Sequence, residues 1–347
     1  IVLVVVIGTS LVLYAWRAPK VGLGQRFGLL SRESMLLINN MLLIAATGAV
    51  LLGTLYPLFL DALGLGKISV GPPYFDTVFG LLMVPVMFAM GIGPLVRWKQ
   101  DEPGSLAGRL RWALPVALAA ALIVGWTAGR ISPVTTGGLT LAFWIVACLA
   151  IDLFERLRPT GLQTSMIARL RRLPLAMVGM MVAHLGVAVF AFGVAMVKTY
   201  EIERDVKMGP DTTTELAGYS LRMVNIRELQ GPNYQATQGQ IEVSRDGKVI
   251  ATLLPAKRIY RVQTNPMTEA AVDSNPLRDI YVSMGEQLPS GEWVVRVQHK
   301  PFIVWIWGGC LIMMLGGTLA ASDRRYRQRR TQSADLPAQA ASMGSAA

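Results

Sequence analysis

The segment that most constrains this chain runs from Leu175 to Val197, LAMVGMMVAHLGVAVFAFGVAMV, and is apolar over 23 residues except for His184. Because an α-helix rises 1.5 Å per residue, about 20 apolar residues cross the hydrocarbon layer of a bilayer. His184 therefore falls near the middle of a predicted membrane helix, where an ionisable side chain is costly and is a functional candidate. Gly179, Gly186 and Gly193 recur every seven residues, which predicts a small-residue packing face opposite His184.

Six further apolar spans predict a polytopic membrane helix bundle. The composition agrees with this class, because 52% of the residues are hydrophobic and only 16% are charged. The chain begins inside an apolar run, with no basic segment before it and no small-residue cleavage site after it. We therefore expect this run to be the remainder of a membrane helix, and the chain to be the C-terminal part of a longer protein. The seven predicted spans are residues 1–16, 33–57, 75–96, 111–129, 134–153, 174–197 and 302–321.

Lys and Arg alternate between the two sides of the predicted membrane. The connections 17–32, 97–110 and 154–173 and the tail after the last span are rich in basic residues, whereas the connections 58–74 and 130–133 carry only Lys67 and Arg130. The positive-inside rule then predicts that the N-terminal end lies outside, that the tail lies inside, and that the helix of His184 runs from inside to outside. The net charge of +11 follows this topology, so no nucleic-acid partner is expected.

The polar stretch before the last span has the pattern of a small β domain. Asp246-Gly247 separates two β-rich runs and predicts a hairpin over residues 241–253. Further strands are predicted at Tyr219–Ile226, Asp279–Ser283 and Trp293–Gln298. The predicted fold is mainly α, with about seven spans and this domain inserted before the last one. Membrane helices one to six are assigned to residues 1–197, the periplasmic β-rich domain to 198–301, the last membrane helix to 302–322, and a basic, then disordered cytoplasmic tail to 323–347.

The candidate chemistry rests on the two histidines of the chain. The sequence has no P-loop, no GxSxG, no HExxH and no paired carboxylates in mid-span. His184 has two interpretations: it is an axial ligand of a haem iron on an apolar helix face, or it hydrogen-bonds a carbonyl or hydroxyl of a neighbouring helix. His299 lies at the outer interface, about 20 Å from His184 by helical rise, so the two cannot hold one iron. We expect His299 to be a surface residue without a redox role.

Four stretches together carry a resemblance to a known family. They are LLINNMLLIAATGAVLLGTLYPL (36–58), KISVGPPYFDTVFGLLMVP (67–85), MVAHLGVAVFAFGVA (181–195) and LRDIYVSMGEQLPSGEWVVRVQHKPFIVWIWGGCLIMMLGG (277–317). Their sequence and order resemble the CcmF family of cytochrome c-type biogenesis proteins, the haem lyase subunits of bacterial c-type cytochrome maturation. The resemblance spans nearly all of this chain but only the C-terminal half or so of that family's length.

The resemblance implies a cofactor, partners and a location. It implies that His184 is an axial ligand of a membrane b-type haem, whose iron it would bind, and that the second axial histidine and a tryptophan-rich haem-presenting loop lie upstream of Ile1. This portion alone is therefore expected to be inactive. The implied role is to take haem from a haem carrier protein and to assist its attachment to apocytochrome c at the periplasmic face of the bacterial inner membrane. Thiol-reducing and apocytochrome-binding maturation subunits are the implied partners.

Two other functions remain open at this stage. The first is a membrane transporter or flippase of haem or another amphiphile, against which the lack of mid-membrane charge pairs and of inverted repeats argues. The second is a structural subunit whose β domain only docks partners. A visible absorption spectrum of the full-length protein separates haem handling from both.

Overall fold

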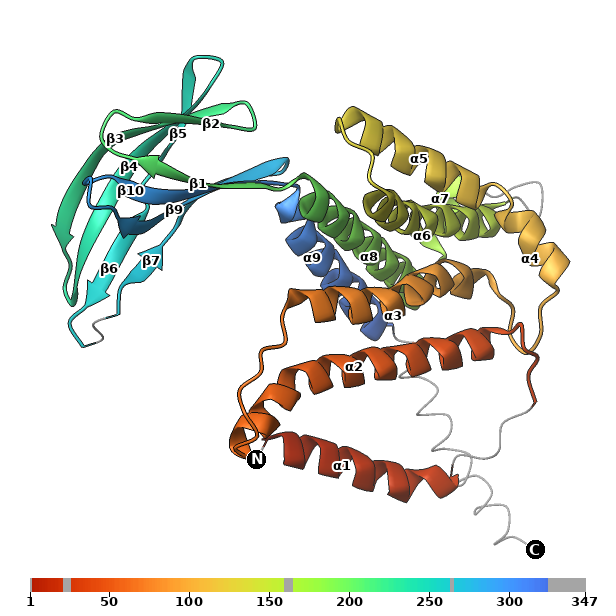
Figure 1. Ribbon diagram of the computed structural model, residues 1–347. Helices are drawn as coiled ribbons and strands as arrows, with labels where there is room; N and C mark the ends of the chain where they lie inside the picture. The colour runs from red at the N-terminus through yellow and green to blue at the C-terminus, as the bar shows by residue number, and fades with distance from the viewer. Residues whose placement is uncertain (1, 21–25, 159–164, 263–264, 324–347) are drawn as a thin grey trace, which may run out of the picture. The chain divides into compact units, whose positions relative to one another are not determined.

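The computed structural model describes residues 2–20, 26–158, 165–262 and 265–323, and Figure 1 labels its helices and strands. Two compact units, Ile1–Leu110 and Arg111–Ala347, divide the chain. Within the described residues, six helical spans are long and apolar enough to cross a membrane: Arg32–Ala62, Pro72–Leu95, Pro103–Thr127, Pro133–Leu157, Leu175–Tyr200 and Ile303–Ala321. A shorter apolar helix, α1 (Val2–Arg17), precedes them. The predicted class, a mainly helical membrane protein with a β domain before the last helix, is confirmed.

The first unit contains α1, α2 (Arg32–Ala62), α3 (Pro72–Ile92) and α4 (Pro103–Leu110). Helices α2 and α3 pack closely where α2 has a glycine. A Cβ built on Gly53 would lie 2.5 Å from a ring carbon of Tyr74 and 3.1 Å from one of Phe75, so a larger residue there would have to displace the Tyr74 ring. The Tyr74 hydroxyl donates a hydrogen bond to the Ala49 carbonyl oxygen at 2.9 Å. This bond ties the start of α3 to the middle of α2.

A buried carboxylate organises the loop between α3 and α4. Asp101 accepts hydrogen bonds from the backbone N–H groups of Arg97 at 3.0 Å and Glu102 at 2.9 Å, and it forms an ion pair with Arg109 at 3.2 Å. Burial alone would raise the pKa of Asp101. The N–H donors of Arg97 and Glu102 and the charges of Arg109 and Arg97 outweigh burial and hold that pKa below its ordinary value. The loop therefore has a fixed shape that an ionised Asp101 maintains.

The second unit begins with helices α5 (Ala113–Thr127), α6 (Pro133–Leu157), α7 (Met166–Arg171) and α8 (Leu175–Tyr200) and ends with α9 (Ile303–Ala321). Helices α8 and α9 lie side by side through glycines (Figure 1). A Cβ built on Gly186 would lie 2.6 Å from the Met313 backbone nitrogen, and one built on Gly309 would lie 2.7 Å from the Gly186 carbonyl oxygen. The predicted glycine packing face is confirmed, and α9 is the helix that covers it.

Ten strands between α8 and α9 form two antiparallel sheets packed on each other. They are β1 (Ile202–Met208), β2 (Thr213–Leu216), β3 (Tyr219–Gln230), β4 (Tyr234–Arg245), β5 (Lys248–Leu253), β6 (Ala256–Tyr260), β7 (Met267–Glu269), β8 (Ala271–Asn275), β9 (Arg278–Gln287) and β10 (Trp293–Pro301). One sheet has the order β1-β10-β9-β8, and the other has the order β2-β3-β4-β6-β7 with β5 also paired to β4. Leu221, Ile241 and Val243 of one sheet and Val282 and Val295 of the other are fully buried between them. The structure is therefore a β-sandwich with its own hydrophobic core.

The predicted hairpin is present as β4 and β5. Asp246 and Gly247 have φ angles of 51° and 76°, and Arg245 pairs with Lys248 across them. Positive φ at both turn residues is the geometry of a two-residue type I′ hairpin, which Asp-Gly favours. The other three predicted strands lie within β3, β9 and β10.

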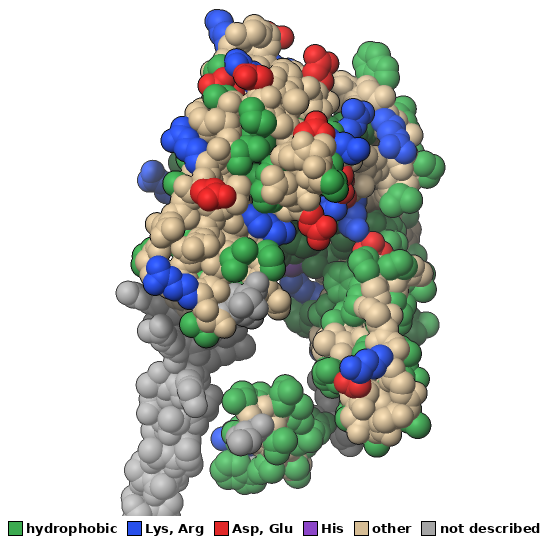
Figure 2. Space-filling view, turned by 60° about the vertical axis from the view of Figure 1, so that its left-hand side comes forward, with side chains coloured by type: hydrophobic (Ala, Val, Ile, Leu, Met, Phe, Trp, Pro, Cys, Tyr) green, Lys and Arg blue, Asp and Glu red, His purple; other side chains and the backbone are tan. Residues whose placement is uncertain are grey.

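The sandwich and the helical pair are continuous along the chain. Strand β1 begins two residues after α8 ends, strand β10 runs into α9, and the two strands pair from Ile202 opposite His299 to Met208 opposite Trp293. At the opposite end of the two helices, the Asp323 carboxylate accepts a hydrogen bond from the Ala176 N–H at 2.8 Å. Figure 2 shows charged side chains of both signs over the sandwich and mostly hydrophobic side chains on the helices. The predicted disordered tail lies outside the described residues.

Candidate functional site

The position of His184 follows from the helical period of α8. Gly179, Gly186 and Gly193 are buried against α9, and His184 lies about 200° around the helix from Gly186. His184 is half-buried, and Ala188, one turn further along on its side of α8, is 2% exposed. The glycine contact with α9 therefore holds the imidazole on the other side of the helix.

The ring orientation of His184 is set by its own helix. The Nδ1 atom lies 2.9 Å from the carbonyl oxygen of Met180, one turn earlier. When Nδ1 carries the proton and donates it to that carbonyl, Nε2 keeps its lone pair, and this is the tautomer in which an imidazole binds a metal. In that tautomer, Nε2 is the ring atom that could hold a metal.

The neighbours of His184 along α8 are apolar. Met180, Met181 and Val187 are half-buried apolar neighbours along α8. Among the described residues, no group of three or more His, Cys, Asp or Glu side chains could hold a bare metal ion. A haem iron is different, because the porphyrin supplies four nitrogens and the protein needs only one axial ligand on each side. One imidazole in an apolar environment is a sufficient donor set for one side of a haem.

Aromatic side chains gather where α6, α8 and α9 approach the sandwich. The ring of Phe192 lies 6.2 Å from that of Phe143, 5.6 Å from that of Phe302 and 5.0 Å from that of Trp305. We call these four residues the aromatic cluster. At the end of α8 that leads into the sandwich, the hydroxyl of Tyr200 donates a hydrogen bond to the Arg130 carbonyl oxygen at 2.5 Å. These contacts fix the helix ends that lead into the sandwich.

His299 is not the surface residue that the sequence predicted. It is half-buried at the end of β10, where its ring stacks on Tyr219 at a centroid distance of 5.8 Å. Arg278 and Arg245 also lie over the Tyr219 ring, at 5.0 Å and 5.2 Å. These three neighbours of His299 cannot be identified from the sequence, because they come from strands whose pairing has no local signal.

Comparison with known proteins places this chain. Residues 199–301 match the family model described as the CcmF C-terminal beta-sandwich. Cytochrome c-type biogenesis protein CcmF of Pseudomonas aeruginosa is 45% identical over 325 residues, which are 94% of this chain and 49% of that protein. The protein of that name in Escherichia coli (strain K12) is 41% identical over 328 residues, with 94% and 49% covered. The chain spans about half the length of these relatives.

A solved structure shares the fold. "Cytochrome c Heme Lyase CcmF" superimposes with a TM-score of 0.67 at 22% identity, over 84% of this chain and 46% of that one. At this identity the likeness shows the arrangement of helices and sandwich. Together with the sequence relatives and the matching sandwich, it leads to one conclusion: the chain belongs to the CcmF family, as a portion that contains the family's C-terminal β-sandwich.

Proposed function

We propose that this chain is part of a haem-handling membrane subunit of cytochrome c maturation, which assists the transfer and covalent attachment of haem to apocytochrome c. Its curated relatives are named cytochrome c-type biogenesis proteins, and its structural relative is named a haem lyase. The observation in this chain that carries the proposal is His184, a half-buried imidazole on a membrane-length apolar helix whose Nδ1 faces a backbone carbonyl. That arrangement suits a haem ligand better than a transport pathway, for which paired charges would be expected in mid-membrane.

The proposed cofactor is a b-type haem with His184 on one side of its iron. A haem held there supplies a one-electron redox couple. The part of this chain is to present Nε2 of His184 in the unprotonated state, through the bond from Nδ1 to Met180, and to keep water away with apolar side chains. The packing of Gly186 on α9 leaves the imidazole on the other side of α8.

The proposed location is the bacterial inner membrane, with the sandwich in the periplasm and the tail in the cytoplasm. The alternation of basic connections supports this orientation. In the periplasm, the sandwich would meet the proposed partners: a haem carrier protein, the thiol-reducing and apocytochrome-binding subunits, and apocytochrome c. Reporter fusions after Arg97 and Arg158 should read cytoplasmic, and one at Asp246 should read periplasmic. A cytoplasmic signal at Asp246 would contradict the orientation.

The experiment that tests the haem ligand is a reduced-minus-oxidised spectrum of the full-length protein with His184→Gly. We expect the b-type bands to weaken or disappear, because one iron–nitrogen bond is lost. Added imidazole should restore a six-coordinate, low-spin spectrum by occupying the space left by the side chain, which a merely structural histidine would not allow. Arg222→Gln, an exposed position on the sandwich away from His184, is the control at matched expression, and its spectrum should equal that of the wild type.

The opposite outcome has a clear meaning. If His184→Gly keeps the wild-type bands and haem content without imidazole, His184 is a hydrogen-bonded core residue and the ligand assignment is wrong. A protein that carries no haem in the wild type, yet moves an amphiphile across vesicles, would instead favour the transporter.

A further inference from the structure

Four side chains from four strands converge at the end of the sandwich that adjoins the helices. Tyr219 begins β3, Arg245 ends β4, Arg278 begins β9, and His299 lies near the end of β10. The Tyr219 hydroxyl oxygen accepts hydrogen bonds from Nε of Arg278 and from Nη1 of Arg245, both at 3.2 Å. We call these four residues the cationic cluster. Two guanidinium groups therefore share one phenol oxygen.

The cationic cluster carries more positive charge than its carboxylates offset. Arg278 is buried and paired with Asp273. Arg245 is half-exposed, and its ion-pair partner, Asp246, lies 3.9 Å away with a side chain that is 94% exposed. An ion pair that is this exposed to solvent contributes little to stability. Arg245 thus presents guanidinium donors that no well-held carboxylate occupies within the described part of the chain.

Two further polar atoms of the cationic cluster have hydrogen-bonding capacity that no described residue uses. The Tyr219 oxygen accepts two N–H groups, so its own proton is directed elsewhere, and the described residues give it no acceptor. The Nδ1 atom of His299 is buried and has no hydrogen-bond partner among the described residues. Burial lowers the pKa of His299, and the charges of Arg278 and Arg245 lower it further, as expected beside uncompensated positive charge.

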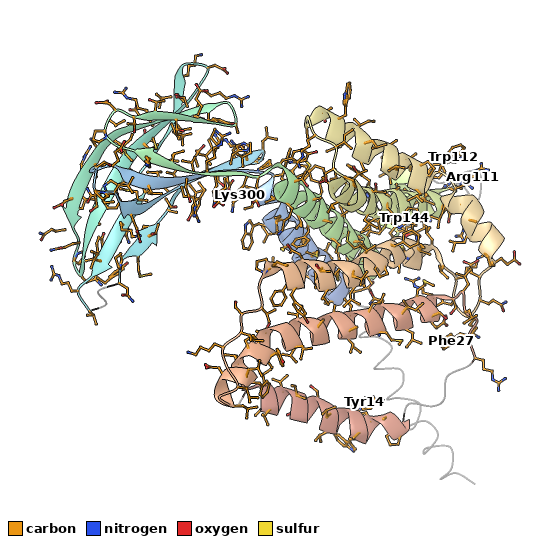
Figure 3. All side chains as sticks on the ribbon, in the orientation of Figure 1. Tyr14, Phe27, Arg111, Trp112, Trp144 and Lys300 are labelled. Atoms are coloured by element: carbon orange, nitrogen blue, oxygen red, sulfur yellow. The ribbon has the colours of Figure 1, made fainter. Side chains whose placement is uncertain are left out.

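The aromatic cluster follows directly along the chain. The N–H of Phe302 donates to the Leu277 carbonyl oxygen at 2.9 Å, and the indole N–H of Trp305 donates to that of Pro276 at 2.8 Å. These bonds fasten the first turn of α9 to the residues just before Arg278. Lys300, which lies between His299 and Phe302 in the sequence, is labelled at this junction in Figure 3. Donors for an oxyanion and aromatic rings for an apolar plane therefore meet at one end of the sandwich.

We propose that the cationic cluster binds a carboxylate of a flat, apolar ligand, and that this carboxylate is a propionate of the porphyrin that the protein handles. The proposal rests on the proposed function. Arg245 supplies the accessible guanidinium, Tyr219 supplies an O–H donor, and Arg278 holds the phenol in place. The phosphate of a lipid headgroup offers similar oxyanion chemistry at a membrane surface, so the test must separate the two sources.

The test uses metal-free protoporphyrin IX and its dimethyl ester with the full-length protein in nanodiscs. Without iron, neither probe can be ligated by His184, and the two differ only in their two carboxylates. Porphyrin fluorescence anisotropy, corrected for partition into empty nanodiscs, gives each Kd. We expect the wild type to prefer the free acid by about tenfold, the value of one charge-assisted hydrogen bond. Arg245→Gln should remove the preference, and Arg245→Lys should keep part of it.

Arg222→Gln is the matched control. Arg222 lies on the same sandwich with a side chain 53% exposed, against 58% for Arg245, and it pairs with Asp211 rather than with the cationic cluster. Its variant should bind both probes like the wild type. Tyr219→Phe keeps the ring but loses the hydroxyl, and it should lower the preference for the free acid even if Arg245→Gln folds poorly.

Two results would overturn the proposal. The first is an equal preference for the free acid in wild type and Arg245→Gln. The second is that Arg245→Gln binds both probes like the wild type but no longer retains phosphatidylglycerol, as measured in nanodiscs with and without that lipid. The cationic cluster would then bind a lipid headgroup. Neither result touches the His184 test, which reads iron ligation, so the failure of one proposal is distinguishable from the failure of the other.

Discussion

Gly309→Ala provides a direct test of how α8 and α9 pack. A Cβ built on Gly309 would lie 2.6 Å from the backbone nitrogen of Phe190 and 2.7 Å from the carbonyl oxygen of Gly186. Both of these atoms are backbone, so no side-chain rotation can relieve the overlap. A Cβ built on the neighbouring Gly308 would have no atom within 4 Å. Gly308→Ala therefore adds the same methyl group to the same helix without a clash.

The size of the effect follows from the overlap. Ordinary contacts of a Cβ begin near 3.4 Å, so the helices must separate locally by about 0.8 Å, the difference between 3.4 and 2.6 Å. A gap of that size removes a quarter to a half of the dispersion energy along the contact. Overpacking of this kind costs about 1–3 kcal/mol. The gain in helix propensity is common to both variants, so the difference between them should be about 1–3 kcal/mol.

The assay is thermal unfolding of the full-length protein, with Gly309→Ala and Gly308→Ala measured in parallel. Gly309→Ala should unfold at a lower temperature than Gly308→Ala, by an amount set by this free-energy difference divided by the unfolding entropy. A second pair repeats the comparison: a Cβ built on Gly316 would lie 2.6 Å from the Gly179 carbonyl oxygen, whereas one on Gly317 has nothing within 4 Å. Equal midpoints within both pairs would refute the close packing of the two helices.

Two further predictions concern ionisable groups. Asp101→Asn should destabilise the loop before α4 by about 1–3 kcal/mol, because a buried, charge-assisted acceptor is lost. Glu102→Gln is the control and should have little effect. Hydrogen exchange of the Arg97 amide measures the difference, and equal exchange in both variants would disprove the role of the Asp101 carboxylate. The sandwich should also lose stability as the pH falls below about 6.5. The pKa of His299 is depressed on folding, so protons bind the unfolded state first, and His299→Gln should flatten this part of the pH–stability curve. An unchanged curve would remove His299 as its cause.

The sequence predicted the helices well, because the bilayer acts locally on each segment. Any run of about 20 apolar residues must form its backbone hydrogen bonds within itself, and a helix does so. The Asp246-Gly247 hairpin was equally predictable, because its two residues tolerate the positive φ that the turn requires. His184 was identifiable as the ionisable residue in its span, and its bond to Met180 is a contact between successive helical turns.

The rest of the sandwich could not be predicted in this way. The order of its strands joins segments far apart in the chain, such as β1 with β10, and nothing local specifies those pairs. The cationic cluster depends on that pairing, because Tyr219 and Arg245 come from one sheet and Arg278 and His299 from the other. A single-residue change of register would turn these side chains to the opposite face. Their meeting is a property of the fold: Tyr219, Arg245 and Arg278 have no distinguishing signal in the sequence, and His299 has none that connects it with them.

The ladder between β1 and β10 restricts how α8 and α9 can move. A helix that slides past its neighbour regains a similar packing after about one turn, about 5.4 Å, whereas a strand must shift by two residues, about 6.6 Å, to keep the same side chains inside. The two strands continue directly from the two helices and pair over seven residues. Because the two steps differ, sliding of α8 along α9 would break the hydrogen bonds between β1 and β10, and the ladder opposes that motion. We therefore expect a displacement of the sandwich to tilt α8 and α9 together, and His184 with them.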